Sequence, residues 1–288
     1  MKKATSLLVL ISIISTGLMA QGKAKSNVED VRMKIIEKAN KLNLKPVTSR
    51  YELNYQLLSA SDQGKFVYYI NFSDMTSAIY CKSNTSEAFA VWGDIFKKYT
   101  SLLNGDIIKG KNGRGESVNQ KYFLGAPTSD EFRTPNKNGA GQHFEGGSIY
   151  WSPATGAHEV HGAIKDKWAA LGWENSFLGF PTTDETTTPD GYGRFNFFEG
   201  GAIYYHPNLG TYTVPKLIAE VWKKEGWETG KLGYPVSGEI IKNNNSVQYF
   251  EFGAVISTKA SPYKVIFNTM REKNGLYSKW RATGGIDS

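Results

Sequence analysis

The amino-acid sequence predicts an α+β fold made of tandem repeats of about 54 residues, each with one helix and a short antiparallel β-meander. First, one octamer occurs three times, as LGAPTSDE, LGFPTTDE and LGYPVSGE, beginning at Leu124, Leu178 and Leu232. Second, the aromatic and acidic residues that follow the first two octamers keep the same spacing of 54 residues. Third, strand-like and helical patterns alternate between the octamers, so the repeat is a structural unit.

Residues 1–20 have the features of a secretory signal peptide. Lys2 and Lys3 are followed by the apolar run SLLVLISII, which is shorter than the ~20 apolar residues of a transmembrane helix. Small residues before Ala20 suit cleavage at that point. No later stretch is apolar enough to span a membrane, so we expect an exported protein that is soluble or held at a surface by non-covalent contacts.

Residues 21–119 are interpreted as a degenerate N-terminal repeat region. EDVRMKIIEKANKL, which begins at Glu29, has the pattern of the repeated helix. SDMTSAIYCKS, which ends at Ser83, resembles the repeated strand segment. WGDIFKKY places Ile95 and Tyr99 where later copies have an isoleucine and a tryptophan. This region therefore adds weaker copies of the same unit.

Residues 120–260 contain three clear repeats, and the second shows the elements best. FNFFEGGAIYYHPNLGTYTV, which begins at Phe195, is rich in aromatic and β-branched residues and contains turn signals, as a short meander does. Pro215 then suits the first turn of a helix, and Gly226 suits its end. The helix carries an apolar stripe made of Leu217, Ile218, Val221 and Trp222.

The octamer is interpreted as the corner between a helix and the next strands. In LGFPTTDE, Pro181 favours an extended Phe180, and Gly179 permits a backbone geometry that other residues avoid. The acidic pairs of the first two octamers are expected to hydrogen-bond local backbone N–H groups, since two adjacent carboxylates are too few for a calcium site. These pairs are Asp130–Glu131 and Asp184–Glu185.

Residues 261–288 are predicted to form a C-terminal helical half-repeat. GLYSKWRATGG, which begins at Gly275, aligns Leu276 and Trp280 with the apolar positions of the repeated helix. The whole chain is thus expected to contain about five helical segments separated by four strand-rich blocks.

Composition excludes several classes of function. The net charge is +7 and the Lys and Arg residues are scattered, so we expect no nucleic-acid partner. Cys81 is the only cysteine, which excludes an intramolecular disulfide and a cysteine-based metal site. His158 and His161 stand three residues apart in a predicted strand and point to opposite faces, so no metal is expected. A nucleophile elbow, a Walker loop and a dinucleotide fingerprint are missing, so no cofactor and no catalytic residue are predicted.

The three octamers, each followed by an FExG segment and a tryptophan-containing helix, resemble tandem LGFP repeats over about residues 120–257. Such repeats occur in exported and cell-envelope proteins of bacteria, alone or appended to enzymes such as mycolyltransferases and amidases. The resemblance implies a non-catalytic module that holds proteins on envelope polysaccharide, with repeats packed around a pseudo-symmetry axis into a ring-like assembly. The third copy departs from the pattern, with Gly238 in place of the octamer's Asp and the second Gly of FEGG lost to Phe252 or its neighbour.

Candidate contacts to a glycan lie in and beside the aromatic strands. Two adjacent aromatic pairs stand in predicted strands, so one member of each faces the core and the other outward, where its ring can stack on the apolar C–H face of a sugar. Burial of both members is the alternative. Two glutamates beside double glycines are candidates to bind either a sugar hydroxyl or a backbone N–H group of the turn. The candidate residues are Tyr150, Trp151, Tyr204, Tyr205, Glu145 and Glu199.

We therefore expect an exported, non-catalytic repeat protein that associates with cell-wall or extracellular polysaccharide through several shallow aromatic and polar subsites, which add through avidity. Two alternatives stay open. One is an envelope-acting hydrolase or amidase with a site in the non-repetitive stretch 109–119 or in residues 1–40. The other is a protein-interaction scaffold without glycan affinity. The sequence determines neither the glycan nor the oligomeric state.

Overall fold

The computed structural model describes residues 28–45, 54–57, 66–71, 76–82, 87–104, 109–111, 117–119, 124–135, 138–258 and 261–267. Within these residues the chain forms four antiparallel sheets of four strands, one two-stranded hairpin and four α-helices. None of the helices in this part of the chain is long and apolar enough to cross a membrane. The predicted signal peptide lies outside the described residues.

Each four-stranded sheet is a meander in which consecutive strands pair. The first sheet contains β1 (Asn54–Leu57), β2 (Phe66–Asn71), β3 (Ser77–Lys82) and β4 (Ala88–Trp92). The second contains β7 (Phe132–Arg133), β8 (Ala140–His143), β9 (Gly147–Ser152) and β10 (Gly156–His161). The third contains β11 (Thr186–Thr187), β12 (Arg194–Phe198), β13 (Gly201–His206) and β14 (Gly210–Pro215). The fourth contains β15 (Ile240–Lys242), β16 (Asn245–Phe250), β17 (Gly253–Thr258) and β18 (Ser261–Phe267).

One helix precedes the first sheet, and one follows each of the first three sheets. The first helix runs over residues 28–41, and the others are α2 (Gly93–Asn104), α3 (Gly162–Ala170) and α4 (Lys216–Lys224). Short 3-10 turns follow the last two helices, as η1 (Trp173–Asn175) and η2 (Trp227–Thr229). The hairpin of β5 (Lys109–Lys111) and β6 (Ser117–Asn119) lies between α2 and the second sheet in the chain. The predicted unit of one helix and one meander is therefore confirmed, and the degenerate N-terminal region contains it as well.

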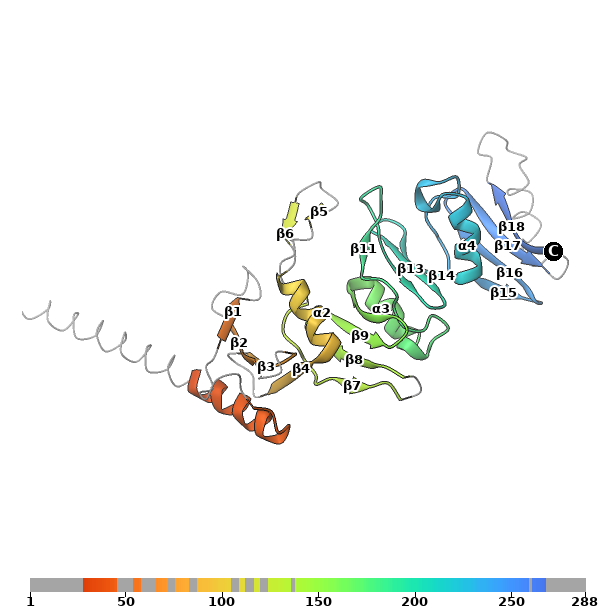
Figure 1. Ribbon diagram of the computed structural model, residues 1–288. Helices are drawn as coiled ribbons and strands as arrows, with labels where there is room; N and C mark the ends of the chain where they lie inside the picture. Colours follow the sequence, from red (N-terminus) through yellow and green to blue (C-terminus); the bar gives the residue numbers. More distant parts are fainter. Residues whose placement is uncertain are drawn as a thin grey trace, which may run out of the picture.

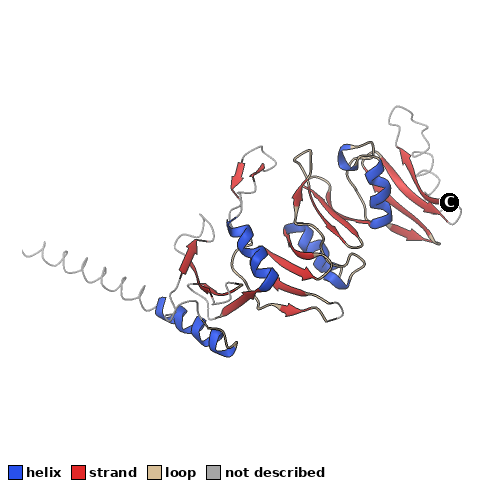
Figure 2. Ribbon diagram, in the orientation of Figure 1, coloured by secondary structure: helices blue, strands red, loops and turns tan. Residues whose placement is uncertain are grey.

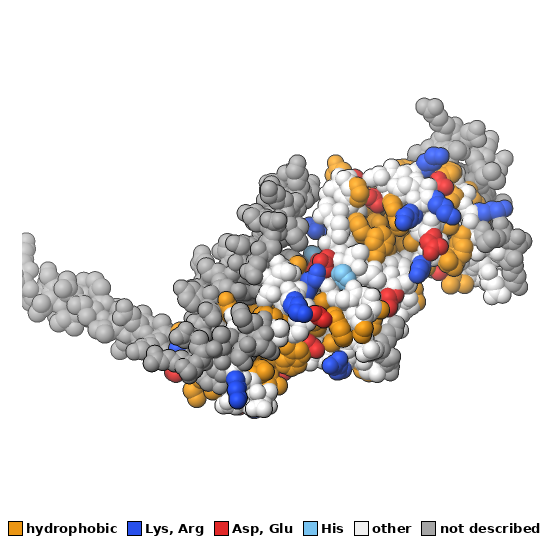
Figure 3. All heavy atoms as spheres, in the orientation of Figure 1, with side chains coloured by type: hydrophobic (Ala, Val, Ile, Leu, Met, Phe, Trp, Pro, Cys, Tyr) orange, Lys and Arg blue, Asp and Glu red, His pale blue; other side chains and the backbone are white. Residues whose placement is uncertain are grey.

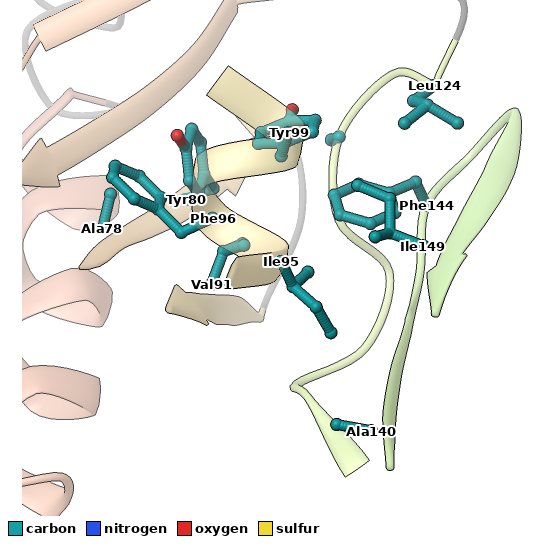
Figure 4. Close-up of a cluster of buried hydrophobic side chains, with 11 residues drawn as sticks. Ala78, Tyr80, Val91, Ile95, Phe96, Tyr99, Leu124, Ala140, Phe144 and Ile149 are labelled. Carbon is teal, nitrogen blue, oxygen red and sulfur yellow. The ribbon is translucent and has the colours of Figure 1, made fainter. Parts of the chain in front are cut away.

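Helices and sheets alternate along the molecule, so that each of α2, α3 and α4 packs between the sheet before it and the sheet after it (Figure 1, Figure 2). Tyr99 on α2 contacts Tyr80 of the first sheet on one side and Phe144 of the second unit on the other (Figure 4). The second and third sheets are thus covered on both faces, and neighbouring strand residues such as Ile149 and Tyr150 are both buried.

The same aromatic cluster recurs in consecutive units. The Trp168 ring on α3 lies edge-on to Tyr150, with ring centroids 4.7 Å apart, and the Trp222 ring on α4 lies edge-on to Tyr204 at the same distance. Both tryptophans are fully buried. Edge-to-face pairs of this kind add about 0.5–1.5 kcal/mol beyond the burial of their area. The aromatic surplus of the sequence is therefore largely core, repeated once per unit.

The LGxP segment forms a corner that is held by the glutamate of the FExG segment. Gly179 has a φ of +70°, which favours glycine, and the Phe180 N–H donates to Glu199 Oε2 at 2.9 Å. Pro181 forms a β-bridge with Phe198, which fixes the segment along the sheet. The equivalent N–H donors and acceptors are Ala126 with Glu145, at 3.0 Å, and Tyr234 with Glu251, at 2.9 Å.

The octamer's aspartate connects units instead of stabilising its own turn. Asp184 accepts a hydrogen bond from the backbone N–H of Glu159 on β10, at 3.2 Å, and forms an ion pair with Lys98 on α2, at 2.8 Å. Burial alone would raise the pKa of Asp184, but hydrogen bonds from His158 and Lys98 lower it to about 2. The partners of Asp130 are the Ala90 N–H, at 2.9 Å, and Lys38. The prediction of bonds to local backbone is therefore wrong, because packing brings the preceding sheet's last strand to the octamer.

Buried amide side chains join the same two segments. Asn196, which is fully buried, donates from Nδ2 to the carbonyl oxygens of Glu159, at 3.0 Å, and Thr183, at 2.9 Å. The equivalent side chains are Gln142, which donates to Ala90 and Ser129, and Gln248, which donates to Thr213 and Ser237. Each amide thus satisfies one carbonyl in each of two neighbouring units, at positions where the sequence suggested only an aromatic strand.

Three expectations change. The ring-like packing is not confirmed, because the described units follow one another in an open row from the first helix to β18 (Figure 1). Residues 261–267 are not part of a helical half-repeat, since they pair with β17 as the last strand of the fourth sheet; residues 268–288 lie outside the described residues. In the third repeat Phe252 replaces the first glycine of FEGG and not the second, because Gly253 starts β17 as Gly201 starts β13.

Candidate functional site

Aromatic and charged side chains meet where one unit is joined to the next. At each such junction, the last strand and first helical turn of one unit lie beside the opening strands of the following sheet. The first junction joins β4 and α2 to the second sheet, the second joins β10 and α3 to the third sheet, and the third joins β14 and α4 to the fourth sheet.

The first junction contains a pocket of about 220 Å³. Trp92, at the end of β4, and Trp151, at the end of β9, contribute two half-buried indole rings to its wall. Charged groups of both units complete the wall. The lining residues are Trp92, Gly93, Asp94, Ile95, Glu131, Arg133, Ala140 and Trp151.

The charges of this pocket are balanced in pairs. Burial raises the pKa of Glu131 above its usual range, while a hydrogen bond from the Trp92 side chain and the positive charge of Arg133 oppose that rise. Asp94 forms an ion pair with Lys97, one helical turn away, at 2.9 Å. The pocket therefore offers carboxylate acceptors, guanidinium donors and two apolar ring surfaces within a small volume.

The second junction holds a closed cluster of ionisable groups at the corresponding place. His161 lies between two carboxylates, with Nδ1 2.8 Å from Glu159 Oε2 and Nε2 3.1 Å from Glu185 Oε1. Arg194 approaches the same Glu185 oxygen with its Nε at 3.6 Å. The backbone N–H of Glu185 donates to Glu159 Oε1 at 3.0 Å, which ties the octamer of one unit to β10 of the preceding one.

Burial and charge shift the pKa values in this cluster. Burial and the charge of Glu159 raise the pKa of Glu185, His161 and Arg194 oppose the rise, and together these effects place the pKa at about 7. Burial alone would lower the pKa of His161, but the hydrogen bond and charge of Glu159 and the charge of Glu185 raise it. In the part of the chain that the structure describes, no group of three or more His, Cys, Asp or Glu side chains is arranged to hold a metal ion.

The structure separates the four aromatic candidates into two classes. Tyr150 and Tyr204 are each only 2% exposed, so the prediction that they contact a glycan is wrong: helices cover both faces of their sheets. Trp151 is half-buried and lines the first-junction pocket. Tyr205 is half-buried at the equivalent place in the second junction and packs against the core cluster between α3 and the third sheet.

Each of the two candidate glutamates binds a backbone N–H group of an LGxP corner with one carboxylate oxygen, and its other carboxylate oxygen does not bind the corner. Glu145 binds the Ala126 N–H with Oε2 and pairs with Lys82 through Oε1. Glu199 binds the corner with Oε2 and also lines a groove of about 570 Å³ beside α4. Both glutamates therefore bind a backbone N–H group, but in the LGxP corner and not in their own turn as predicted. Whether either also binds a sugar hydroxyl stays a prediction.

The groove beside α4 combines aromatic and charged side chains. Phe197 and Trp227 form its aromatic wall, with ring centroids 5.5 Å apart, and charged residues of α4 line the other side. Acidic and basic side chains lie among hydrophobic ones over this region of the surface (Figure 3). The charged lining residues are Glu199, Lys216, Glu220 and Lys223.

Sequence reasoning did not identify Trp92, Glu131 and Arg133 as site residues. The signal that could have found them is a difference between copies. Aligned with the second junction, Trp92 stands where that junction has His161, and Arg133 stands where it has Thr187. Residues that break an otherwise regular repeat indicate where the side chains around one copy differ from those around the next.

A family model described as the LGFP repeat matches residues 124–176 and 178–230. The chain therefore contains two tandem LGFP repeats, which begin at the first two octamers; the match does not extend to the third predicted copy, which begins at Leu232. Each match starts at the corner, continues through one four-stranded sheet and one helix, and ends at or just after the following 3-10 turn. Comparison with curated proteins finds none that matches the chain.

Proposed function

We propose that this chain is an exported, non-catalytic repeat protein that associates with cell-wall or extracellular polysaccharide through shallow aromatic and polar subsites. The observation that carries the proposal is the first-junction pocket, where two indole rings stand beside two carboxylates and a guanidinium. The groove beside α4 is the second subsite, since it has the same combination of aromatic and charged side chains.

The chemistry of these side chains suits a sugar. A pyranose ring presents apolar C–H groups on its faces and hydroxyl groups at its edge. An indole ring provides a large flat apolar surface for the face. The Glu131 carboxylate accepts hydrogen bonds from hydroxyl groups, and the Arg133 guanidinium donates hydrogen bonds to their oxygen atoms.

Weak subsites suit a repeat protein on a polymer. Each pocket contacts only one short stretch of the polysaccharide, but two subsites on one molecule raise the apparent affinity because the second binding event is intramolecular. Residues 1–20 would direct the protein out of the cell, and the subsites would then retain it on the surface polymer.

The test is co-sedimentation of the chain, produced without residues 1–20, with insoluble cell-wall and polysaccharide preparations at low salt. We expect the protein to sediment with at least one of them, and Trp151→Ala to sediment less. Tyr192→Ala is the matched control, because Tyr192 is a large aromatic residue that is 63% exposed and lies outside both subsites. Failure to sediment with every preparation would overturn the proposal.

The same incubations test the non-catalytic part of the proposal. After sedimentation, the supernatant is assayed for soluble sugars and for newly released amines. We expect neither above the level of a heat-denatured sample. Release that depends on the folded protein would identify a hydrolase or amidase instead.

A further inference from the structure

The three junctions place equivalent positions side by side, because the strand registers repeat. In the second sheet Arg133 pairs with Ala140 and Ala140 pairs with Trp151 across three neighbouring strands. The corresponding rows are Thr187, Arg194 and Tyr205 in the third sheet, and Ile241, Ser246 and Ser257 in the fourth. The side chains at these equivalent register positions can therefore be compared directly between the three junctions.

At the second junction, large side chains occupy the place that is open at the first. Arg194 stands at the position of Ala140, and its guanidinium approaches Glu185, the equivalent of Glu131. His161 stands at the position of Trp92 and binds the same carboxylate. The carboxylate that faces the pocket at the first junction is thus consumed by internal partners at the second.

At the third junction, the aromatic surfaces are missing. Pro215 stands at the position of Trp92, and Ser257 stands at the position of Trp151. Neither residue has an aromatic ring on which a sugar face can stack. Among these equivalent positions of the three described junctions, only those of the first combine a free volume, aromatic rings and a carboxylate that faces the volume.

The size and charge of the first-junction pocket restrict the class of ligand that it can bind. Its 220 Å³ lies below the roughly 300 Å³ at which pockets begin to take drug-sized ligands, so one sugar unit fits better than a length of chain. Asp94 is neutralised by Lys97, and Glu131 lies beside Arg133, so the pocket has no excess charge to attract an ionic ligand.

We infer that the first-junction pocket binds a single neutral hexopyranose unit and that the equivalent places at the other two junctions bind none. This inference rests on the proposed function and sharpens it. The sugar stacks on Trp151 and Trp92, its hydroxyl groups donate to Glu131, and Arg133 donates to a hydroxyl oxygen. Sugars with a carboxylate or an ammonium group bind more weakly, because the balanced charges of the pocket leave their charge uncompensated.

The deciding variant is Ala140→Arg, which places at the first junction the residue that fills the second. Ser246→Arg makes the same change at the third junction and is the matched control. Trp151→Ala is a second variant, which removes one indole ring and introduces no bulkier side chain. Circular dichroism and tryptophan fluorescence check that each variant is folded; if Ala140→Arg does not fold, Trp151→Ala decides the outcome.

Binding is measured by ligand-observed NMR titration with methyl glycosides of glucose, galactose, mannose and N-acetylglucosamine, and with glucuronic acid and glucosamine for comparison. We expect at least one neutral glycoside to bind. We expect Ala140→Arg and Trp151→Ala to weaken that binding at least about tenfold, and Ser246→Arg to leave it unchanged. We expect both charged sugars to bind more weakly than the best neutral glycoside.

The inference is overturned if no neutral glycoside binds, if a charged sugar binds best, or if the folded pocket variants bind as tightly as the parent chain. Co-sedimentation distinguishes failure of this inference from failure of the proposed function. If the parent chain and both pocket variants sediment equally with a polysaccharide, the inference fails and polysaccharide association stands. If the parent chain sediments with none, the proposed function itself fails.

Discussion

The corner glycine of each octamer is predicted to be essential for stability because it makes room for the glutamate that holds the corner. In the third repeat, Gly233 has a φ of +70°, and a Cβ atom there would lie 2.6 Å from Glu251 Oε2 and 3.0 Å from Glu251 Cβ. Glu251 accepts the Tyr234 N–H at 2.9 Å. Gly233→Ala therefore strains the backbone and displaces the carboxylate at the same time.

The two effects have separate magnitudes. A non-glycine residue in the left-handed region costs roughly 1–2 kcal/mol. Loss of the bond from the partly buried Tyr234 N–H to the displaced carboxylate adds about 1–3 kcal/mol. Gly233→Ala is thus expected to lower the free energy of unfolding by about 2–5 kcal/mol. Gly191→Ala is the matched control, with a φ of +80° but nothing within 4 Å of the added Cβ, so it is expected to cost only about 1–2 kcal/mol.

The assay is urea unfolding followed by tryptophan fluorescence. Trp222 reports on this corner, because it is fully buried and its indole N–H donates to the Gly233 carbonyl at 3.1 Å. A double variant with Glu251→Ala separates the two effects, because the 2.6 Å collision with Oε2 and the carboxylate's hydrogen bond are then already gone, and Gly233→Ala adds backbone strain and only the 3.0 Å contacts with the Glu251 Cβ atom and Phe252. Equal destabilisation by Gly233→Ala and Gly191→Ala, or full additivity in the double variant, would refute the reasoning.

Three further predictions concern the contacts between units. Asp184→Asn removes the ion pair with Lys98 and is expected to lower stability at pH 7. The pKa of Asp184 is lowered to about 2, so the parent chain loses this contribution to stability as pH falls from about 4 through 2. In urea unfolding at several pH values, the free energy of unfolding of the variant should therefore depend less on pH in that range. The pKa of Glu185 is raised from 4.5 to about 7, so the folded state binds more protons than the unfolded state and the contribution of Glu185 to stability falls as pH rises from about 4.5 through 7. The pKa of His161 is raised above 6.5, so its contribution falls at higher pH. Glu185→Gln should reduce the slope between about pH 4.5 and 7 in the same assay, and an unchanged slope would contradict the assignment. Gln248→Leu leaves two backbone carbonyl oxygens of neighbouring units without their amide donor. The free energy of unfolding should fall by about 2 kcal/mol or more, measured by thermal or urea unfolding. Unchanged stability would disprove this prediction.

The repeat spacing predicted much of the fold. Glycine and proline at fixed places in LGFPTTDE identified the corner, since their backbone preferences are local properties. The alternation of aromatic strand and amphipathic helix likewise predicted the order of the elements. The octamer's acids were interpreted less well. Asp184 looked like a turn residue, but its partners Lys98 and Glu159 lie far back in the chain, and no local pattern indicates them.

The candidate site was predictable only in part. Trp151 was identified because adjacent aromatic residues in a strand must point in opposite directions, and it lines the pocket. The prediction that Tyr150 and Tyr204 contact a glycan was wrong for a related reason. Strand alternation determines that two neighbours point apart, but it does not determine whether one of the two faces is open, and here helices cover both.

By itself, the sequence determined the length of the unit, the order of its elements and the position of each corner, because repetition, turn chemistry and apolar periodicity act over a few residues. Only the tertiary structure decided what lies at each junction. Trp92 and His161 occupy the same place in consecutive units, yet one borders an open pocket and the other completes a buried cluster with Glu185 and Arg194. That difference depends on side chains brought together from two units, and a residue that departs from the repeat does not itself indicate which distant side chain it contacts.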